Sequence, residues 1–313
     1  MDPKGLCDMS KIVDTKFFRS QGYVVVPEIV SERLIDPVCQ GIEKFCGIKL
    51  DDSSTWSSIV AHKNGLPELN DSGMVELYHH PSMWALRQIP EIYSVFADLW
   101  KQEALWVSID RCNLNTPQRS KDDFSGFVHW DVDTSVEPLP FGLQGFVALT
   151  DCDIGGGGFH CVPGMPDRLG EWIKTQPYSR DPFRPDLSGL EVVEVPVRKG
   201  DLLVWNSLLP HGTAVNTSNQ PRLVQYLSMA PAQEENLVLK NRRVHAWRNC
   251  IAPEGDAFPG DPRGWEKQKG TTADLNSLGR KLLGLDSWQI SNDESPPNIN
   301  RVSQKSDSGV PGF

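Results

Sequence analysis

Residues 197–227, VRKGDLLVWNSLLPHGTAVNTSNQPRLVQYL, contain the strand pattern that decides the fold. A Lys-Gly-Asp turn opens an apolar run that ends before Pro210, and a second apolar run begins at Arg222. Short runs of this kind, bounded by Gly, Pro, Asp and Asn, are typical of antiparallel strands. Comparable runs occupy residues 105–114, 141–151, 190–206 and 222–231. Together they predict a sandwich or barrel of antiparallel strands.

Helical periodicity surrounds this series on both sides. The apolar spacing predicts helices over residues 13–22, 31–46, 82–100, 235–249 and 275–285, with one strand at 22–30. Ser31 is the candidate N-cap of the second helix, and Pro90 breaks the third into a pair. The predicted fold class is therefore mainly β with flanking helices.

The 313 residues suit a single large domain built from four segments. Residues 1–104 form a mainly helical N-terminal support, and residues 105–232 form the β core. An insertion at about 167–189, rich in Pro, Arg and Asp, interrupts the core and is a candidate lid. Residues 233–290 form a C-terminal helical segment, and the polar residues 291–313 are predicted to be a disordered tail.

Composition and net charge limit the classes of molecule that the protein is expected to bind. The net charge of −10 disfavours nucleic acid and anionic membranes, and the short basic run at 240–243 is typical of a solvated helix face. The seven cysteines include no CxxC pair, which indicates a reducing compartment. With no apolar run long enough to cross a bilayer, the prediction is a cytoplasmic protein that acts on a small molecule. Nothing in the sequence indicates an oligomeric state.

The segment FVHWD, residues 127–131, carries the first chemical signal. In an extended chain, side chains at i and i+2 point to the same face, so the imidazole of His129 and the carboxylate of Asp131 would converge. Two histidines and one carboxylate on one face of an octahedral iron leave three positions open for co-substrate and dioxygen. The pair alone is weak evidence, because it could equally be a local structural contact.

His211 and Arg222 supply the other candidate groups. His211 lies in a Pro-His-Gly context, and Arg222 follows eleven residues later. Taken singly, His211 could bond a backbone carbonyl at a strand end, and Arg222 could close a surface salt bridge. It is the combination of the four residue types with their spacing that favours a functional site.

From about Val107 to Met229 the chain resembles the phytanoyl-CoA dioxygenase family of the 2-oxoglutarate oxygenases. The matching pieces are DRCNLNTP, HWD, ALTDCDIGGGGFHCVPGMP and the KGD to HG to Arg block. The resemblance implies a double-stranded β-helix, a jelly-roll or cupin-like core. It further implies iron ligands His129, Asp131 and His211, and the co-substrate contacts Arg222, Thr213, Asn113 and Phe146. Arg222 would meet the distal carboxylate of 2-oxoglutarate, for which a guanidinium is well shaped.

The implied activity uses Fe(II), 2-oxoglutarate and O₂ to oxidise, most simply to hydroxylate, a C–H bond of a metabolite, with release of succinate and CO₂. The chain departs from the family pattern at Met165 and Pro166, where Ser-His is common, and at Asn115, where a lysine is frequent. Ser135 replaces a tryptophan of the ectoine hydroxylases, so ectoine is not predicted as substrate. Related halogenases lack the carboxylate ligand, which leaves its coordination site to chloride. Because Asp131 is present in this chain, halogenation is disfavoured.

Two other functional classes remain open on the sequence. One is a jelly-roll metal enzyme without 2-oxoglutarate, such as a cupin-type isomerase or hydrolase, and the other is a catalytically silent binding module. Outside the proposed site, His79 and His80 are predicted to have a cap or surface role. Arg111 is as well explained by a structural ion pair as by an acidic substrate group, and Trp205 by the core as by a pocket wall.

Overall fold

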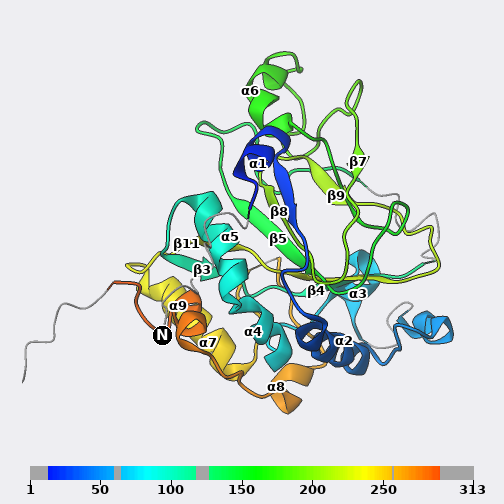
Figure 1. The fold of residues 1–313 in the computed structure, drawn as a ribbon, viewed down its shortest axis with the longest axis vertical. Helices are drawn as coiled ribbons and strands as arrows, with labels where there is room; N and C mark the ends of the chain where they lie inside the picture. The colour runs from blue at the N-terminus through cyan, green and yellow to red at the C-terminus, as the bar shows by residue number, and fades with distance from the viewer. Residues whose placement is uncertain (1–12, 60–64, 118–126, 256, 290–313) are drawn as a thin grey trace, which may run out of the picture.

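An antiparallel six-stranded sheet forms the centre of the computed structural model, which describes residues 13–59, 65–117, 127–255 and 257–289 (Figure 1). Its strands, in spatial order, are β1 (Tyr23–Val26), β8 (Leu202–Asn206), β5 (Leu143–Ala148), β10 (Arg222–Tyr226), β4 (Cys112–Asn115) and β2 (Met74–Val75). Every pairing is antiparallel. The prediction of antiparallel sheets is thus confirmed, although the predicted 105–114 strand is broken in two.

Two smaller sheets complete the β structure of the described residues. One contains β7 (Val193–Glu194), β6 (Phe159–Cys161) and β9 (His211–Thr213), and the other contains β11 (Met229–Pro231) and β3 (Leu105–Val107). A buried cluster joins the six-stranded sheet to the sheet of β6, β7 and β9, with ring centroids of Phe159 and Trp205 5.0 Å apart. The two sheets therefore face each other across an apolar interior.

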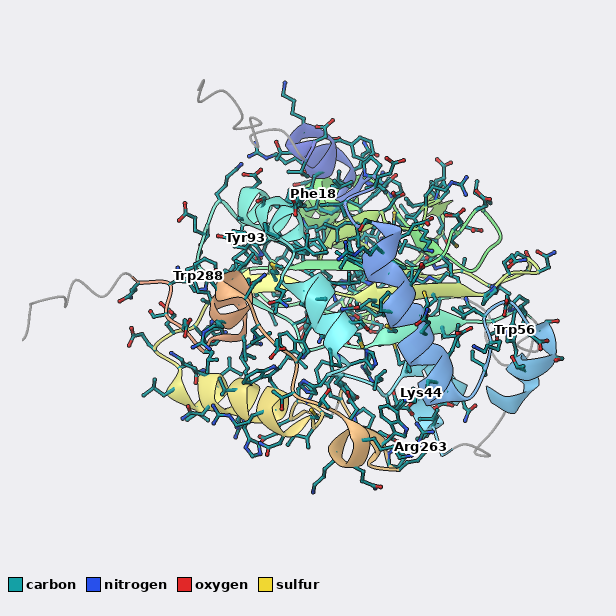
Figure 2. The ribbon with its side chains drawn as sticks, turned by 60° about the horizontal axis from the view of Figure 1, so that its bottom comes forward. Phe18, Lys44, Trp56, Tyr93, Arg263 and Trp288 are labelled. Atoms are coloured by element: carbon teal, nitrogen blue, oxygen red, sulfur yellow. The ribbon has the colours of Figure 1, made fainter. Side chains whose placement is uncertain are left out.

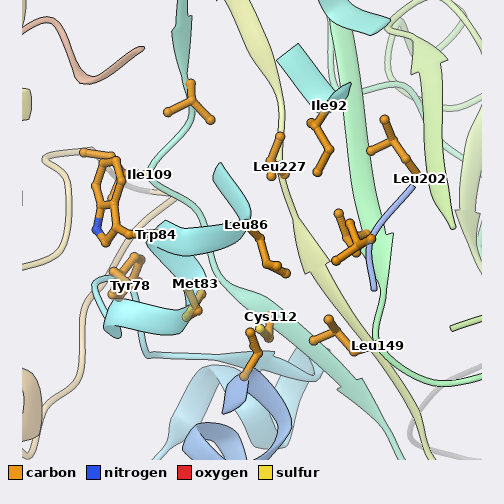
Figure 3. Close-up of a cluster of buried hydrophobic side chains, with 14 of the residues drawn as sticks. Tyr78, Met83, Trp84, Leu86, Ile92, Ile109, Cys112, Leu149, Leu202 and Leu227 are labelled. Atoms are coloured by element: carbon orange, nitrogen blue, oxygen red, sulfur yellow. The ribbon is translucent and has the colours of Figure 1, made fainter. Parts of the chain in front are cut away.

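Some of the helical segments cover the opposite face of the six-stranded sheet. The helical segments are α1 (Thr15–Gln21), α2 (Glu32–Cys46), η1 (Ser53–Ile59), α3 (Pro67–Ser72), α4 (Pro81–Arg87), α5 (Pro90–Trp100), α6 (Met165–Lys174), α7 (Leu237–Asn249), α8 (Trp265–Lys269) and α9 (Ser277–Leu283). Figure 3 shows Met83, Leu86 and Ile92 from α4 and α5 packed towards Leu202 of β8 and Leu227, which directly follows β10. Strand alternation thus sends one set of side chains to the helices and the other set to the interior between the sheets. No described helix is long and apolar enough to cross a membrane.

Local residue chemistry explains several element ends. Gly22 ends α1 with φ 85°, a left-handed conformation that favours glycine. Pro90 is the first residue of α5, where its fixed φ suits a helix start. Ser31 holds the N-cap position of α2, but its side chain makes no capping hydrogen bond, so that expectation is met in position only.

The Lys-Gly-Asp turn ties the N-terminal strand to the core. Gly200 has φ 97°, and an added Cβ would lie 2.5 Å from the carbonyl oxygen of Val30. The buried carboxylate of Asp201 accepts hydrogen bonds from the backbone N–H groups of Glu28 (2.9 Å) and Arg198 (2.7 Å). The motif therefore closes a turn and at the same time holds the end of β1 beside β8.

The C-terminal segment packs back onto the helical face (Figure 2). The guanidinium of Arg263 lies 4.4 Å from the ring centroid of Phe45 in α2, and Trp288 stacks on Tyr93 of α5 at 5.4 Å. The predicted disordered tail, residues 291–313, lies outside the described residues.

Two residues on the helical side depart from the sequence expectations. In the basic run the side chain of Arg242 is 57% exposed, as expected, but Arg243 turns inward: it donates hydrogen bonds to the carbonyl oxygens of Val107 (2.7 Å), Leu282 and Leu283 (both 3.1 Å), and burial lowers its pKa to about 10. His79 is buried rather than at the surface, and burial lowers its pKa to about 3. His80 is the N-cap of α4, as the cap alternative predicts.

Glu266 of α8 fastens the C-terminal segment to residues 78–79. Its buried carboxylate accepts hydrogen bonds from the backbone N–H groups of Tyr78 (2.8 Å) and His79 (2.5 Å). Burial raises the pKa of Glu266 to about 7, although these hydrogen bonds act in the opposite direction. The native state consequently binds a proton more tightly than the unfolded chain does.

We expect the free energy of unfolding to fall as the pH rises from about 5 to about 8, by up to about 3 kcal/mol from this group. Glu266→Gln should remove that part of the pH dependence, because the side chain can no longer release a proton. Urea denaturation at pH 5 and pH 8 measures the change, with Glu171→Gln, at a glutamate whose side chain is 81% exposed, as the control. An unaltered slope in the Glu266 variant would contradict this account.

Candidate metal centre

A backbone pairing joins the two histidine segments. The N–H of His129 donates to the carbonyl oxygen of His211 (2.9 Å), and the N–H of His211 donates to that of His129 (3.0 Å). His129 therefore forms an isolated antiparallel β-bridge with the first residue of β9. The two imidazole rings lie with their centroids 5.0 Å apart as a result.

The side chains of His129, Asp131 and His211 converge on one point. The ligand atoms of the three lie within 4.8 Å of one another, and they are the one such group of histidine, cysteine and acidic residues in the described parts of the chain. Asp131 Oδ1 lies 3.0 Å from His129 Nε2, and Asp131 Oδ2 lies 3.5 Å from His211 Nε2. Donor atoms at about 2 Å from a common ion and at right angles would be about 3 Å apart, so the set fits one metal ion. The sequence predicted that these three side chains converge, and their distances agree with that prediction.

His211 is held in an orientation suited to a ligand. Its Nδ1 lies 2.9 Å from the carbonyl oxygen of Leu209, an arrangement in which Nδ1–H donates and Nε2 keeps its lone pair. The ring stacks on Phe159 at 5.7 Å and contacts Trp205 at 5.0 Å. Trp205 is therefore both a core residue and a wall of the interior beside the site.

Asp131 is an anionic group at neutral pH. Burial by itself would raise the pKa of its carboxyl, but the adjacent imidazoles of His129 and His211 and a hydrogen bond from Gln144 outweigh this and hold the pKa well below its ordinary value. Gln144 Nε2 donates to Asp131 Oδ2 over 2.6 Å. The sequence reasoning missed Gln144, although a polar residue two positions before Phe146 on one strand was a usable signal.

Arg222 forms the second part of the candidate site. It is 2% exposed, and its Nη1 donates to Asn113 Oδ1 over 2.7 Å. Its guanidinium carbon lies 5.2 Å from the ring centroid of Phe146, which in turn contacts Trp205 at 6.0 Å. Three of the predicted co-substrate residues thus lie together, linked to His211 through ring contacts.

Two residues of the family pattern, Thr213 and Asn115, make no side-chain hydrogen bond to Arg222 in the described chain. Thr213 pairs with Phe159 in the register of β6 and β9, and among the described residues its hydroxyl makes no hydrogen bond to Arg222. Asn115, which replaces the frequent lysine, donates from Nδ2 to the carbonyl oxygens of Gly157 (3.1 Å) and Ala214 (3.2 Å). Its amide therefore joins the two sheets, which is a structural task.

The other candidates have structural surroundings. Arg111 lies 3.6 Å from the carboxylate of Glu68 and donates to the carbonyl oxygen of Ala257 at 2.8 Å, which favours the ion-pair alternative. A further histidine near the site, His160, lies 3.4 Å from the carbonyl oxygen of Phe127 and is not part of the cluster.

The predicted insertion contacts the histidine segment directly. The N–H of Trp130 donates to the carbonyl oxygen of Phe183 (2.8 Å), and Arg180 Nη1 donates to Thr134 Oγ1 (2.8 Å). These bonds hold residues 180–183 beside the chain that carries Asp131. Its role as a lid stays a prediction.

Comparison with known proteins identifies the family. A family model described as phytanoyl-CoA dioxygenase matches residues 18–224, which is well over half of the chain. The chain belongs to the phytanoyl-CoA dioxygenase family. Membership supports an oxygenase-type enzyme.

Individual relatives of this family member are distant. A Dictyostelium discoideum protein that carries the family's name is 23% identical over 316 residues, covering 86% of each chain. Ava biosynthesis cluster protein O of Aspergillus versicolor is 23% identical over 239 residues, covering 68% of this chain and 76% of its own.

Solved structures show the same fold at still lower identity. The structure of GlcNAc Inducible Gene 2 from Candida albicans has a TM-score of 0.66 at 14% identity, covering 89% of this chain and 77% of that one. A hypothetical protein from Escherichia coli has a TM-score of 0.64 at 16% identity, covering 86% and 81%. These similarities describe the fold alone.

Gly212 explains why glycine follows the histidine in the Pro-His-Gly stretch. A Cβ added there would lie 2.0 Å from the carbonyl oxygen of Phe127 and 2.7 Å from His160 Nε2. The backbone of the His129 segment therefore presses against β9 at a point where no side chain fits.

We expect Gly212→Ala to push the His129 segment away and to lower the free energy of unfolding by about 1–3 kcal/mol. Chemical denaturation measures this loss. Gly170→Ala in α6, where an added Cβ meets nothing within 4 Å, is the matched control and should be neutral or slightly stabilising. Equal stability of the two variants would show that the close approach is not a constraint.

Proposed function

We propose that this protein is an Fe(II)- and 2-oxoglutarate-dependent dioxygenase that hydroxylates a C–H bond of a small-molecule metabolite, with release of succinate and CO₂. His129, Asp131 and His211 would hold the iron, and Arg222 would hold the distal carboxylate of 2-oxoglutarate. Asn113, Phe146 and Thr213 would line the co-substrate pocket. Family membership and the convergence of the three side chains support the proposal.

One observation carries it: a buried guanidinium without an acidic partner lies between the sheets and is linked to the candidate ligand His211 through the rings of Phe146 and Trp205. None of the ion pairs among the described residues involves Arg222, and its Nε has no hydrogen-bond partner there. A buried charge without a counter-charge is costly. A dicarboxylic acid would supply that counter-charge and form charge-assisted hydrogen bonds with the guanidinium.

Each group has a distinct task in this proposal. Bound iron(II) supplies the activation of dioxygen that C–H oxidation needs. Arg222 orients the dicarboxylic acid, while Asn113 fixes the guanidinium through its amide oxygen. The rings of Phe146, Phe159 and Trp205 exclude water from the space between the sheets. Asp131, with its side chain 41% exposed, leaves one side of the centre open to a substrate.

We also propose that the two facing sheets form a double-stranded β-helix. The sheet of β6, β7 and β9 lies against the six-stranded sheet across the buried cluster around Phe146 and Phe159. The histidine pair would then lie at the end of this barrel and Arg222 deeper inside it. Such an arrangement separates the metal position from the carboxylate-binding group.

Metal binding is the first test. Anaerobic addition of Fe(II) and 2-oxoglutarate to the purified protein should produce a weak visible absorption band, and chelation of the metal should remove it. His129→Ala should abolish the band, because one of three ligands is lost. His245→Ala, at an exposed histidine on α7, should keep it. A band of full intensity in the His129 variant would refute the ligand assignment.

Arg222→Met tests the co-substrate assignment. We expect the affinity for 2-oxoglutarate to fall about 10–100-fold, the equivalent of losing charge-assisted hydrogen bonds, with Fe(II) affinity largely retained. Titration of the visible band with 2-oxoglutarate measures the first quantity, and succinate release measures turnover. Arg111→Met is the matched control, since that cation is paired with Glu68. Unchanged 2-oxoglutarate affinity in the Arg222 variant would refute the assignment of Arg222, whereas absence of 2-oxoglutarate binding in the wild-type protein would favour a metal enzyme of the cupin type.

A further inference from the structure

Gln144 occupies an inward position on the strand next to the candidate metal centre. It shares a face of β5 with Phe146, because side chains alternate along a strand, and it lies opposite Trp205 in the register with β8. Strand β5 is paired on both sides, with β8 and with β10. The half-buried side chain is therefore presented from an interior strand of the sheet, and not from a loop or an edge strand.

The amide of Gln144 is oriented by the carboxylate that it meets. Nε2 donates to Asp131 Oδ2 over 2.6 Å, while Oε1 is buried and accepts no hydrogen bond within the described chain. The reversed amide would place Oε1 against an anionic oxygen, which is repulsive. The contact is thus a charge-assisted hydrogen bond with a single favourable orientation.

Asp131 lacks the support that the two histidines have. His129 and His211 are fixed by their mutual backbone hydrogen bonds, whereas Asp131 lies in a bend two residues beyond that pairing. Its carboxylate contacts the two imidazoles and Gln144 among the described residues. Gln144 is therefore the group from outside the cluster that holds it.

We propose that Gln144 is a positioning residue, which holds the carboxylate of Asp131 by Oδ2 and leaves Oδ1 for the metal ion. This inference rests on the proposed function, since it assigns Asp131 as an iron ligand. Hydrogen bonds from outer groups commonly orient ligating carboxylates, and their loss typically costs about 10–100-fold in metal affinity. The same magnitude is expected here.

Gln144→Met tests the inference, because methionine keeps the length of the side chain and removes the donor. The Fe(II) dissociation constant is measured anaerobically without 2-oxoglutarate, beside the thermal unfolding of the metal-free protein. Gln225→Met is the matched control. Gln225 is a buried glutamine on β10 whose Nε2 donates to the carbonyl oxygen of Met83 over 3.0 Å, on the helical face of the same sheet.

The Fe(II) dissociation constant should rise about 10–100-fold in Gln144→Met and stay within about twofold of wild type in Gln225→Met. Wild-type affinity in Gln144→Met, or an equal loss in both variants, would overturn the positioning role while leaving the metal centre intact. If the wild-type protein itself binds no Fe(II), the proposed function fails and this inference fails with it. Gln144→Leu repeats the measurement should the methionine variant not fold.

Discussion

The pairing of His129 with His211 through two backbone hydrogen bonds is the constraint on which the site depends. Ordering a loop residue costs conformational entropy, and here backbone groups rather than side chains offset part of that cost. The imidazoles are consequently free for other contacts. Gly212 makes the pairing possible, since the backbone of Phe127 passes where any side chain would stand.

The six-stranded sheet separates structural and chemical tasks by its two faces. The face towards the helices carries apolar side chains such as Leu202, which packs with Leu227 against α4 and α5 (Figure 3). The other face carries Arg222, Asn113 and Gln144, at positions that alternate with the packed ones. Groups presented from paired strands are more precisely held than groups on loops. The helical side thus supports the sheet, while the candidate site residues named here lie on its other face.

Three arginines held within the fold illustrate the difference between a structural and a binding cation. Arg87 donates to the carbonyl oxygens of Tyr78 (2.8 Å) and Asp110 (2.5 Å), and Arg243 donates to three backbone carbonyls. Backbone oxygens from different segments accept hydrogen bonds from both of these cations and so tie the helical side together, although the Nε of Arg87 has no partner in the described chain. Arg222 instead donates to no backbone carbonyl among the described residues: its Nη1 donates to one side-chain amide, and its Nε has no partner there. A charge left in that condition favours an anionic ligand.

The sequence by itself determined the local structure and the residue types of the site. Apolar alternation and the Gly, Pro and Asp boundaries predicted most strands, and the His129, Asp131, His211 and Arg222 pattern led to the family. Only the tertiary structure decided that residues 105–114 supply two different sheets, that Arg243 turns inward to backbone carbonyls, that His79 is buried, and that Gln144 meets Asp131. Local conformation follows from neighbouring residues, whereas strand partners and burial depend on segments that are distant in the chain.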